Sequence, residues 1–267
     1  ALLEKGTYQA PDGTQVEIGV RQTYSEQHTC LYTPDQLKTL CAEAPSAQCE
    51  TRIELVDATT QVAASRLAEE EGELVLLNFA SARNPGGGFL NGARAQEEDL
   101  CRCSGLYPTL LTQMGYYEAN RSYASTLYTD HMIYSPRVVF FRTKGRGPLL
   151  REPFESSVIT APAPNTGAFL QHPKSDVAQI KQTFVRRWRQ VLSIAYAQGH
   201  RNVLLGAWGC GAFRNDPSMA VETCLSWLEE GGTFAGVFAR IVFAIPATGK
   251  RSMENFLVFQ KRLQGWV

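Results

Sequence analysis

The sequence predicts an α/β fold around a central sheet that is mixed but largely parallel. The chain has 267 residues, of which 44% are hydrophobic, and this is enough to bury roughly three quarters of the surface of the unfolded chain. Continuous apolar runs alternate with segments of helical periodicity, as in proteins whose strands are covered on both faces. No period of roughly 20 to 50 residues repeats, which excludes a solenoid.

Several segments are predicted as strands of this sheet. They are residues 51–56, 72–80, 137–143, 156–164, 202–208 and 240–246. Because helices are predicted between strands, ligands are expected to bind at the carboxyl ends of the strands. The loops that follow the strands are therefore where functional residues are expected.

Two of the predicted helices have recognisable ends. Asp176 caps a segment of apolar residues at three- or four-residue steps, and Gly199 ends it where a left-handed cap is expected. Asp216 and Pro217 start the second helix, which ends before Gly231. These two helices separate the last three predicted strands.

Residues 1–50 are polar and rich in turns, unlike the rest of the chain. One short helix is predicted among them, after Thr33 and Pro34. We interpret this segment as an N-terminal extension that packs on a domain spanning residues 51–267.

Charge and cysteine content argue against several classes of function. Lys plus Arg (26) equals Asp plus Glu (26), so no net basic field attracts DNA, and an anionic ligand must be held by a shaped pocket. The seven cysteines are scattered and odd in number, which is typical of a reducing compartment, and Cys101 and Cys103 lack a second pair that would complete a zinc site. No apolar run reaches the roughly 20 residues that span a bilayer, and no signal-peptide pattern opens the chain. We expect a cytoplasmic protein that uses no metal and binds neither DNA nor membrane.

The first candidate site is a glycine-rich loop directly after the strand predicted at 72–80. Gly86, Gly87 and Gly88 have no Cβ that would keep a ligand from the backbone, so their N–H groups can point at phosphate or ribose oxygens. A mobile turn would have the same composition. The interpretation as a binding loop therefore depends on what lies beside it.

A second glycine-rich loop, residues 206–216, leads from a predicted strand into the helix at Pro217. Free amides and the helix dipole at such a junction favour a diphosphate. The loop lacks the lysine of an NTP-hydrolysing loop. Together the two loops predict a diphosphate that is bound and not cleaved.

Three acids lie at a predicted helix start, where Glu97, Glu98 and Asp99 follow Gln96. Acids are common there because they complement the helix dipole. Successive helical residues point about 100° apart, so at most one of these carboxylates faces a given bond, whereas ordinary glycosidases place two acids across it. If the site cleaves a glycosidic bond, one residue must act first as acid and then as base.

The order of GGG, a short spacer and QEE resembles the signature of the poly(ADP-ribose) glycohydrolases, and the wider chain is similar to the bacterial-type branch of that family. The similarity runs from about Arg52 to the C-terminal region through the segments DATT, NFASARNPGGG, QEE, LYPTL, IYSPRVVFFR, VITAPAPN, GAWGCGAFRND and VFAIP. It implies a three-layer α/β/α macrodomain-like catalytic domain. It also implies an enzyme that hydrolyses ribose–ribose O-glycosidic bonds and releases ADP-ribose without a metal or organic cofactor.

The resemblance implies roles for the site residues as well. Glu98 is the expected acid/base, which protonates the oxygen leaving the anomeric carbon of the terminal ribose and, after an oxocarbenium-like state, deprotonates the attacking water. Glu97 is expected to hydrogen-bond a ribose hydroxyl of the neighbouring unit. The triglycine is expected to line the terminal ribose, and the amides of residues 209–212 to hold the diphosphate. The expected ligand-binding residues are Asn84, Gly86, Gly87, Gly88, Gln96, Gly209, Cys210, Gly211, Ala212, Phe213, Asp57 and Thr59.

Several of these residues have a second interpretation. Asp57 or Thr59 would meet the adenine, but an acid after a strand equally caps the next helix. Phe213 would cover the sugar or the adenine, or else pack its own loop. Cys210 could be a nucleophile, but no histidine or acid lies near it in sequence, and a small loop residue explains it better.

The tyrosines are concentrated in one stretch of the chain, where they could stack adenines or, more commonly, pack an irregular segment. They are Tyr107, Tyr116, Tyr117, Tyr123, Tyr128 and Tyr134.

Two other functions remain compatible with the sequence. The two glycine loops alone would serve a non-catalytic ADP-ribose reader, which has no need for Glu98. A hydrolase that removes single ADP-ribose groups from proteins would share the same terminal-ribose pocket. For the leading interpretation, the expected partners are poly(ADP-ribose) and ADP-ribosylated proteins as substrates, with ADP-ribose as product, and the expected oligomeric state is a monomer.

Overall fold

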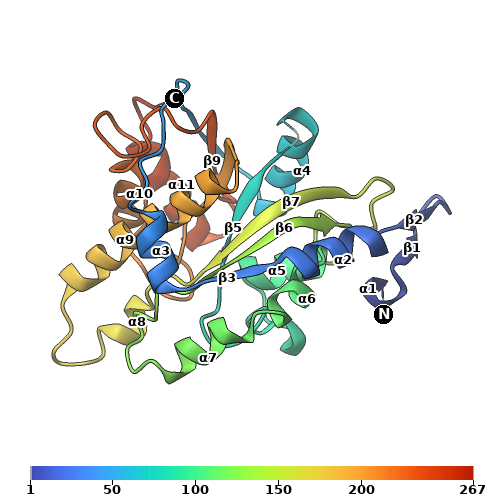
Figure 1. Ribbon diagram of the computed structural model, residues 1–267, viewed down its shortest axis with the longest axis horizontal. Helices are drawn as coiled ribbons and strands as arrows, with labels where there is room; N and C mark the ends of the chain where they lie inside the picture. The colour runs from blue at the N-terminus through green and yellow to red at the C-terminus, as the bar shows by residue number, and fades with distance from the viewer. Residues whose placement is uncertain (1, 72, 267) are drawn as a thin grey trace.

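In the computed structural model, which describes residues 2–71 and 73–266, seven strands form a central sheet in the order β3–β6–β7–β5–β8–β9–β4 (Figure 1). The strands are β3 (Cys30–Tyr32), β4 (Arg52–Val56), β5 (Val75–Phe79), β6 (Met132–Phe140), β7 (Phe154–Ala161), β8 (Asn202–Leu205) and β9 (Arg240–Ala244). Neighbouring strands from β4 through β9, β8 and β5 to β7 pair in parallel, whereas β6 and β3 pair antiparallel. The prediction of a mixed, largely parallel sheet is confirmed.

One strand is longer and earlier than predicted, because the segment assigned to 137–143 belongs to β6, which begins at Met132. The pairing of β6 with β7 shifts just after Ser135, and Arg137 there has a φ of +49°, which marks a β-bulge. Polar residues before the bulge interrupt the apolar run and hide the first half of the strand. Of the strand predicted at 72–80, Gly72 lies outside the described residues.

Helices cover both faces of the sheet (Figure 1). Alternate residues of β5 belong to two different hydrophobic cores, because Val75 and Leu77 pack into one and Leu76 into the other. The first core also contains residues of α9 (Val177–Ala197), α10 (Pro217–Leu225) and α11 (Lys250–Arg262). The second contains residues of α4 (Thr60–Glu71), α5 (Gln96–Cys103), α6 (Leu106–Leu111) and α7 (Met114–Ser122). The three-layer α/β/α arrangement is therefore confirmed.

The predicted starts of both helices and the predicted end of α9 are confirmed, whereas α10 ends at Leu225, earlier than the end predicted before Gly231. The side chain of Asp176 accepts a hydrogen bond from the N–H of Ala178 at 2.8 Å, and Gly199 has a φ of +81° at the end of α9. At the start of α10, the side chain of Asp216 accepts from the N–H of Ser218 at 2.7 Å.

The N-terminal segment contributes an edge of the central sheet. Its strand β3 pairs with β6, α2 (Gly19–His28) packs on β6, and α3 (Pro34–Leu40) packs on α9. The predicted helix after Thr33 is α3, which a Thr33–Gln36 capping box starts. The helix α2 escaped prediction because the residues it buries, Gln22 and Ser25, are polar and form no apolar stripe. The remaining elements are α1 (Leu2–Lys5), α8 (Thr166–Phe169), a short 3-10 helix η1 (Phe89–Asn91) and a hairpin of β1 (Thr7–Gln9) and β2 (Gln15–Glu17).

The candidate loops leave neighbouring strands at one edge of the sheet. Because β5, β8, β9 and β4 are successive parallel neighbours, the loops after their carboxyl ends lie side by side. No helix in the part of the chain that the structure describes is long and apolar enough to cross a membrane.

Candidate active site

The start of α5 is fixed to the end of β5 by the side chain of Gln96. Its Oε1 accepts a hydrogen bond from the N–H of Phe79 at 2.8 Å, and its Nε2 donates to the carbonyl of Leu77 at 2.8 Å and to Thr60 Oγ1 at 3.2 Å. The amide group of Gln96 therefore bridges β5, α4 and α5. This bridge sets the position of the acids that follow it.

Glu98 lies between the glycine loop and the first turn of its own helix. Its Oε1 accepts from the N–H of Gly88 at 2.8 Å, and its Oε2 accepts from the N–H of Ala95 at 2.9 Å. The side chain is buried, with 8% of the residue exposed. The sequence prediction that the glycines and the acids lie together is thus reproduced at Gly88 and Glu98.

Glu97 is enclosed more completely, with 3% of the residue exposed. Its Oε2 accepts from the N–H of Ser81 at 2.7 Å, and its Oε1 accepts from Asn78 Nδ2 at 3.2 Å. Burial raises the pKa of Glu97 to about 8, against the opposing effect of these hydrogen bonds, and the neighbouring charge of Glu98 adds to the rise. Burial therefore favours the neutral form of Glu97.

This pKa predicts a pH-dependent effect of Glu97→Gln on stability. The folded pKa lies above the ordinary value of 4.5, so between these two pH values the folded state binds more protons than the unfolded state and the free energy of unfolding falls as pH rises. Gln cannot ionise, so the variant should gain stability relative to wild type from pH 5 to pH 8, by on the order of 3 kcal/mol. Urea denaturation at both pH values measures this gain, with the exposed Glu118→Gln as the matched control. An equal difference between variant and wild type at the two pH values would contradict the assignment.

The triglycine holds the acids rather than presenting its amides to the cleft. The N–H of Gly86 interacts with the Glu97 carboxylate and opposes the rise in the pKa of Glu97. The N–H of Gly88 donates to Glu98 Oε1, whereas the N–H of Gly87 donates to the Asn84 carbonyl at 2.9 Å. This differs from the expectation that these amides point at phosphate or ribose oxygens. The glycines are needed for close approach: a Cβ on Gly87, whose φ is +60°, would lie 3.0 Å from Glu97 Oε2 and closer still to Glu98 Oε1.

The second loop does offer unoccupied amides. Among the described residues, no hydrogen-bond partner is found for the N–H groups of Gly209, Gly211, Ala212 and Phe213. The N–H of Cys210 is engaged, because it donates to the Ala207 carbonyl at 3.1 Å. Successive free amides of this kind form an anion-binding concavity.

Asn215 supports this loop from beneath. It is buried, and its Nδ2 donates to the carbonyls of Pro164 at 2.9 Å and Gly209 at 3.1 Å, while its Oδ1 accepts from Thr166 Oγ1. Gly209 has a φ of +74°, and a Cβ there would lie 2.6 Å from the Cβ of Ala163. The left-handed backbone at residue 209 therefore requires glycine, and the free amides of residues 211–213 follow it in the loop.

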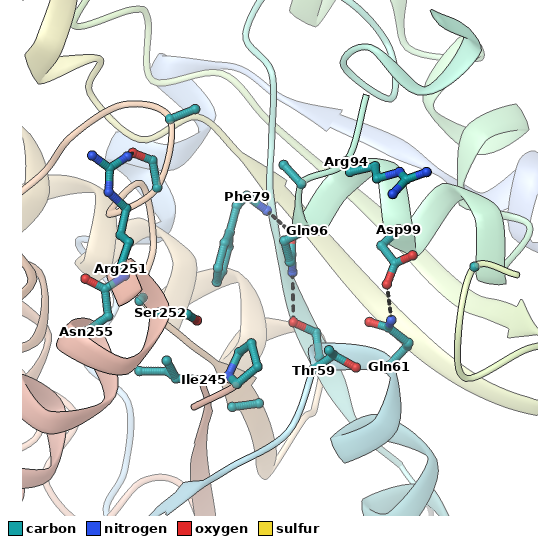
Figure 2. A pocket seen from close by; sticks show the side chains of 18 of the residues that line it. Thr59, Gln61, Phe79, Arg94, Gln96, Asp99, Ile245, Arg251, Ser252 and Asn255 are labelled. Carbon is teal, nitrogen blue, oxygen red and sulfur yellow. Dashed lines mark hydrogen bonds between the residues drawn. The ribbon is translucent and has the colours of Figure 1, made fainter. Parts of the chain in front are cut away.

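A cleft of about 790 Å³ is lined by the second loop on one side and by residues around the start of α5 on the other (Figure 2). Figure 2 shows Gln96 near its centre, with Arg251 and Asn255 on one side and Arg94 and Asp99 on the other. Of the residues predicted from the sequence, those lining the cleft are Thr59, Gln96, Gly209, Gly211, Ala212 and Phe213. Glu97, Glu98, Asn84, Asp57, Cys210 and the triglycine are not in its lining.

The predicted residues outside the lining have other environments. Glu98 lies directly behind the wall, because its hydrogen-bond partner Ala95 is itself a lining residue. Asn84 is exposed, and Asp57 accepts a hydrogen bond from the N–H of Ala247 at 2.7 Å. Burial raises the pKa of the Cys210 thiol to about 12, so it is not a reactive thiolate.

The cleft is locally positive, which the sequence did not reveal. Arg94, Arg102, Arg146 and Arg251 line it, against one acid, Asp99. Arg251 lies on α11 and donates to the Gly211 carbonyl at 2.9 Å. These arginines come from separate segments of a chain with no net charge, and the fold brings them together in one cleft. A chain without a net basic charge must bind an anion through such a local pocket.

A macrodomain-like α/β/α fold with a buried acid pair beside a cationic, amide-bearing cleft defines an enzyme of the glycosidase class for an anionic sugar substrate. No group of His, Cys, Asp and Glu that could hold a metal ion is found in the described ranges. The chain belongs to the family described as microbial-type PARG, catalytic domain, whose sequence profile matches residues 1–143; PARG denotes poly(ADP-ribose) glycohydrolase.

Solved structures similar to the chain include those of two enzymes, from Thermomonospora curvata and Deinococcus radiodurans. The poly(ADP-ribose) glycohydrolase of Thermomonospora curvata is 42% identical with a TM-score of 0.92, and the match covers 97% of this chain and 94% of that chain. The same enzyme bound to the inhibitor ADP-HPD gives a TM-score of 0.90 at 42% identity, with the same coverage of 97% and 94%. The enzyme of Deinococcus radiodurans in complex with ADP-ribose is 42% identical with a TM-score of 0.86, over 91% of this chain and 97% of that chain. A search of curated proteins gives no match.

Proposed function

We propose that this PARG-family enzyme hydrolyses the ribose–ribose O-glycosidic bond at the end of poly(ADP-ribose), with Glu98 as its acid/base. The main support for this proposal is the position of the Glu98 carboxyl group behind the wall of the cleft. It accepts hydrogen bonds from the N–H groups of Gly88 at 2.8 Å and Ala95 at 2.9 Å. A side chain fixed in this way needs no reorganisation when the sugar arrives.

The substrate is held from two sides in this proposal. The diphosphate of the terminal unit binds the free amides of Gly211, Ala212 and Phe213, with the cleft arginines supplying positive charge. The Phe213 ring, whose centroid lies 6.0 Å from that of Tyr128, covers the sugar side. The distal ribose then lies toward the triglycine loop, where the two acids are.

The reaction proceeds in two proton transfers on one residue. Protonated Glu98 donates its proton to the bridging oxygen as the bond from that oxygen to the anomeric carbon breaks, and the shortened chain leaves with a hydroxyl group. A water molecule then attacks the oxocarbenium-like carbon and gives one of its protons to the Glu98 carboxylate. Glu97, whose neutral form is favoured by burial, is proposed to hydrogen-bond a ribose hydroxyl of the neighbouring unit.

A catalytic role fits the acid pair better than the role of an ADP-ribose reader. Burial raises the pKa of Glu97 to about 8 and so costs folding free energy at neutral pH. A protein that only binds ADP-ribose gains nothing from this arrangement. The free amides of the second loop and the cleft arginines would be enough for a protein that only binds ADP-ribose.

The expected partners follow from the same chemistry. We propose that ADP-ribosylated proteins carry the polymer to the enzyme, that ADP-ribose is the product, and that the enzyme acts as a monomer in the cytoplasm. All seven cysteines are free thiols, which fits a reducing compartment.

The test is incubation of the wild-type protein with automodified poly(ADP-ribose) and, in parallel, with mono-ADP-ribosylated protein. We expect release of ADP-ribose from the polymer, detected by chromatography, with little release from the mono-modified protein. Release from the mono-modified protein alone would replace the proposed substrate. Binding of ADP-ribose with no release from either would indicate a reader.

A further inference from the structure

Two exposed arginines and an exposed tyrosine lie together next to the glycine loop. Arg121, in the last turn of α7, donates through Nη1 to the carbonyl of Arg83 at 2.8 Å. Tyr123 follows α7 directly and is 47% exposed. We call Arg83, Arg121 and Tyr123 the exit surface.

The arginines of the exit surface are available to a ligand. In the ranges that the structure describes, neither Arg83 nor Arg121 forms an ion pair. The nearest acid along α7 is Glu118, which is also exposed and is not paired with Arg121. Exposed guanidinium groups of this kind bind phosphate through paired N–H donors.

Tyr123 differs from the other tyrosines of its stretch. Tyr116, Tyr117, Tyr128 and Tyr134 are buried, which is the packing role that such a cluster commonly has. Tyr123 is the exposed large aromatic in this part of the chain. An exposed aromatic ring beside cationic groups is the arrangement on which nucleic-acid bases stack.

The exit surface continues into the loop that holds the acids. Arg83 precedes Asn84, whose carbonyl accepts a hydrogen bond from the N–H of Gly87 at 2.9 Å. The N–H of Gly88, which follows Gly87, donates to Glu98. In the proposed function the terminal unit fills the cleft, and the rest of the chain is attached through the oxygen that Glu98 protonates. The leaving chain must therefore extend away from the cleft, past the glycine loop.

We propose that the exit surface binds the ADP-ribose unit on the leaving side of the scissile bond, with its phosphates on Arg83 and Arg121 and its adenine on Tyr123. This inference rests on the proposed function and gives the enzyme a preference for polymer over a single ADP-ribose group. A mono-modified protein has no such unit and gains nothing from this surface.

The test compares Arg83→Ala/Arg121→Ala with Arg66→Ala/Lys181→Ala, which removes two exposed cations elsewhere. With long poly(ADP-ribose) as substrate, we expect the exit-surface variant to raise KM about fivefold at unchanged kcat. Loss of two phosphate contacts should also weaken the slope of log KM against log salt concentration by about 1.4, or about 0.7 per contact. The affinity for free ADP-ribose should not change. Arg83→Lys/Arg121→Lys should restore the salt dependence, and Tyr123→Ala should raise KM alone.

Three results would overturn the proposal: an unchanged KM for polymer, an equal loss of affinity for free ADP-ribose, or the same effect in the control variant. Thermal melting of each variant identifies loss of fold, and the charge-retaining lysine variant keeps the test valid if the alanine variant unfolds. Failure of the proposed function is distinguishable, because the wild-type protein would then release no ADP-ribose from polymer.

Discussion

Glu98→Gln is expected to lower kcat on poly(ADP-ribose) by about 10²- to 10⁴-fold, which is the usual contribution of general acid–base catalysis. The amide keeps the shape of the side chain but cannot give its proton to the leaving oxygen or take one from water. Because the free amides of residues 211–213 and the cleft arginines are untouched, the Kd for ADP-ribose should stay within about tenfold, or 1.4 kcal/mol. Initial rates of ADP-ribose release and calorimetric titration with ADP-ribose measure the two quantities.

The matched control is Glu118→Gln, which removes an exposed carboxylate from α7. It should leave both kcat and the affinity for ADP-ribose unchanged. Retention of turnover by the Glu98 variant would remove this residue from the mechanism, whereas parallel loss of turnover and affinity would make it a binding residue.

Gly87→Ala is expected to damage the site and the fold together. Gly87 has a φ of +60°, and a left-handed backbone costs an L-residue about 1–2 kcal/mol. The added Cβ would also lie 3.0 Å from Glu97 Oε2 and closer to Glu98 Oε1, so both carboxyls must move. We expect a loss of about 2–4 kcal/mol in the free energy of unfolding and a fall of about 100-fold in kcat, because a displacement of about 1 Å at a reacting group has that effect.

Gly199→Ala separates the two causes. Gly199 also has a positive φ, +81°, but a Cβ there would meet nothing within 4 Å. This control should lose about 1–2 kcal/mol of stability with kcat unchanged. If Gly87→Ala behaved like Gly199→Ala in both measurements, the close approach of the glycine loop to the acids would have no catalytic consequence.

The sheet and the caps were predictable because they depend on local pattern. Continuous apolar runs identified β5 and β8, and Asp176 and Asp216 identified the starts of α9 and α10, since each residue acts on backbone groups next to it. β6 was harder to place because a bulge at Arg137 breaks its pattern. α2 was missed because its buried face is polar.

The site was predictable only in part. The proximity of Gly88 and Glu98 follows from their short separation on one loop and helix start. The direction of the glycine N–H groups does not, because it depends on left-handed φ values at Gly86 and Gly87 that the composition allows but does not impose. A GGG sequence alone therefore could not distinguish amides that bind a ligand from amides that hold two glutamates.

Contacts between distant segments were outside the reach of the sequence. Asn78 lies on a buried strand that reads as apolar, yet it donates to Glu97. Arg251 approaches the second loop from α11, forty residues later in the chain. Such pairs depend on the order of the strands in the sheet, which no local pattern encodes.

The most direct measurement is a crystal structure of the Glu98→Gln protein with bound ADP-ribose. We expect the diphosphate to lie on the N–H groups of residues 211–213, and the anomeric carbon of the distal ribose to lie within about 3–4 Å of the residue 98 amide. A distal ribose that turns away from position 98, with that side chain still enclosed by Gly88 and Ala95, would contradict it.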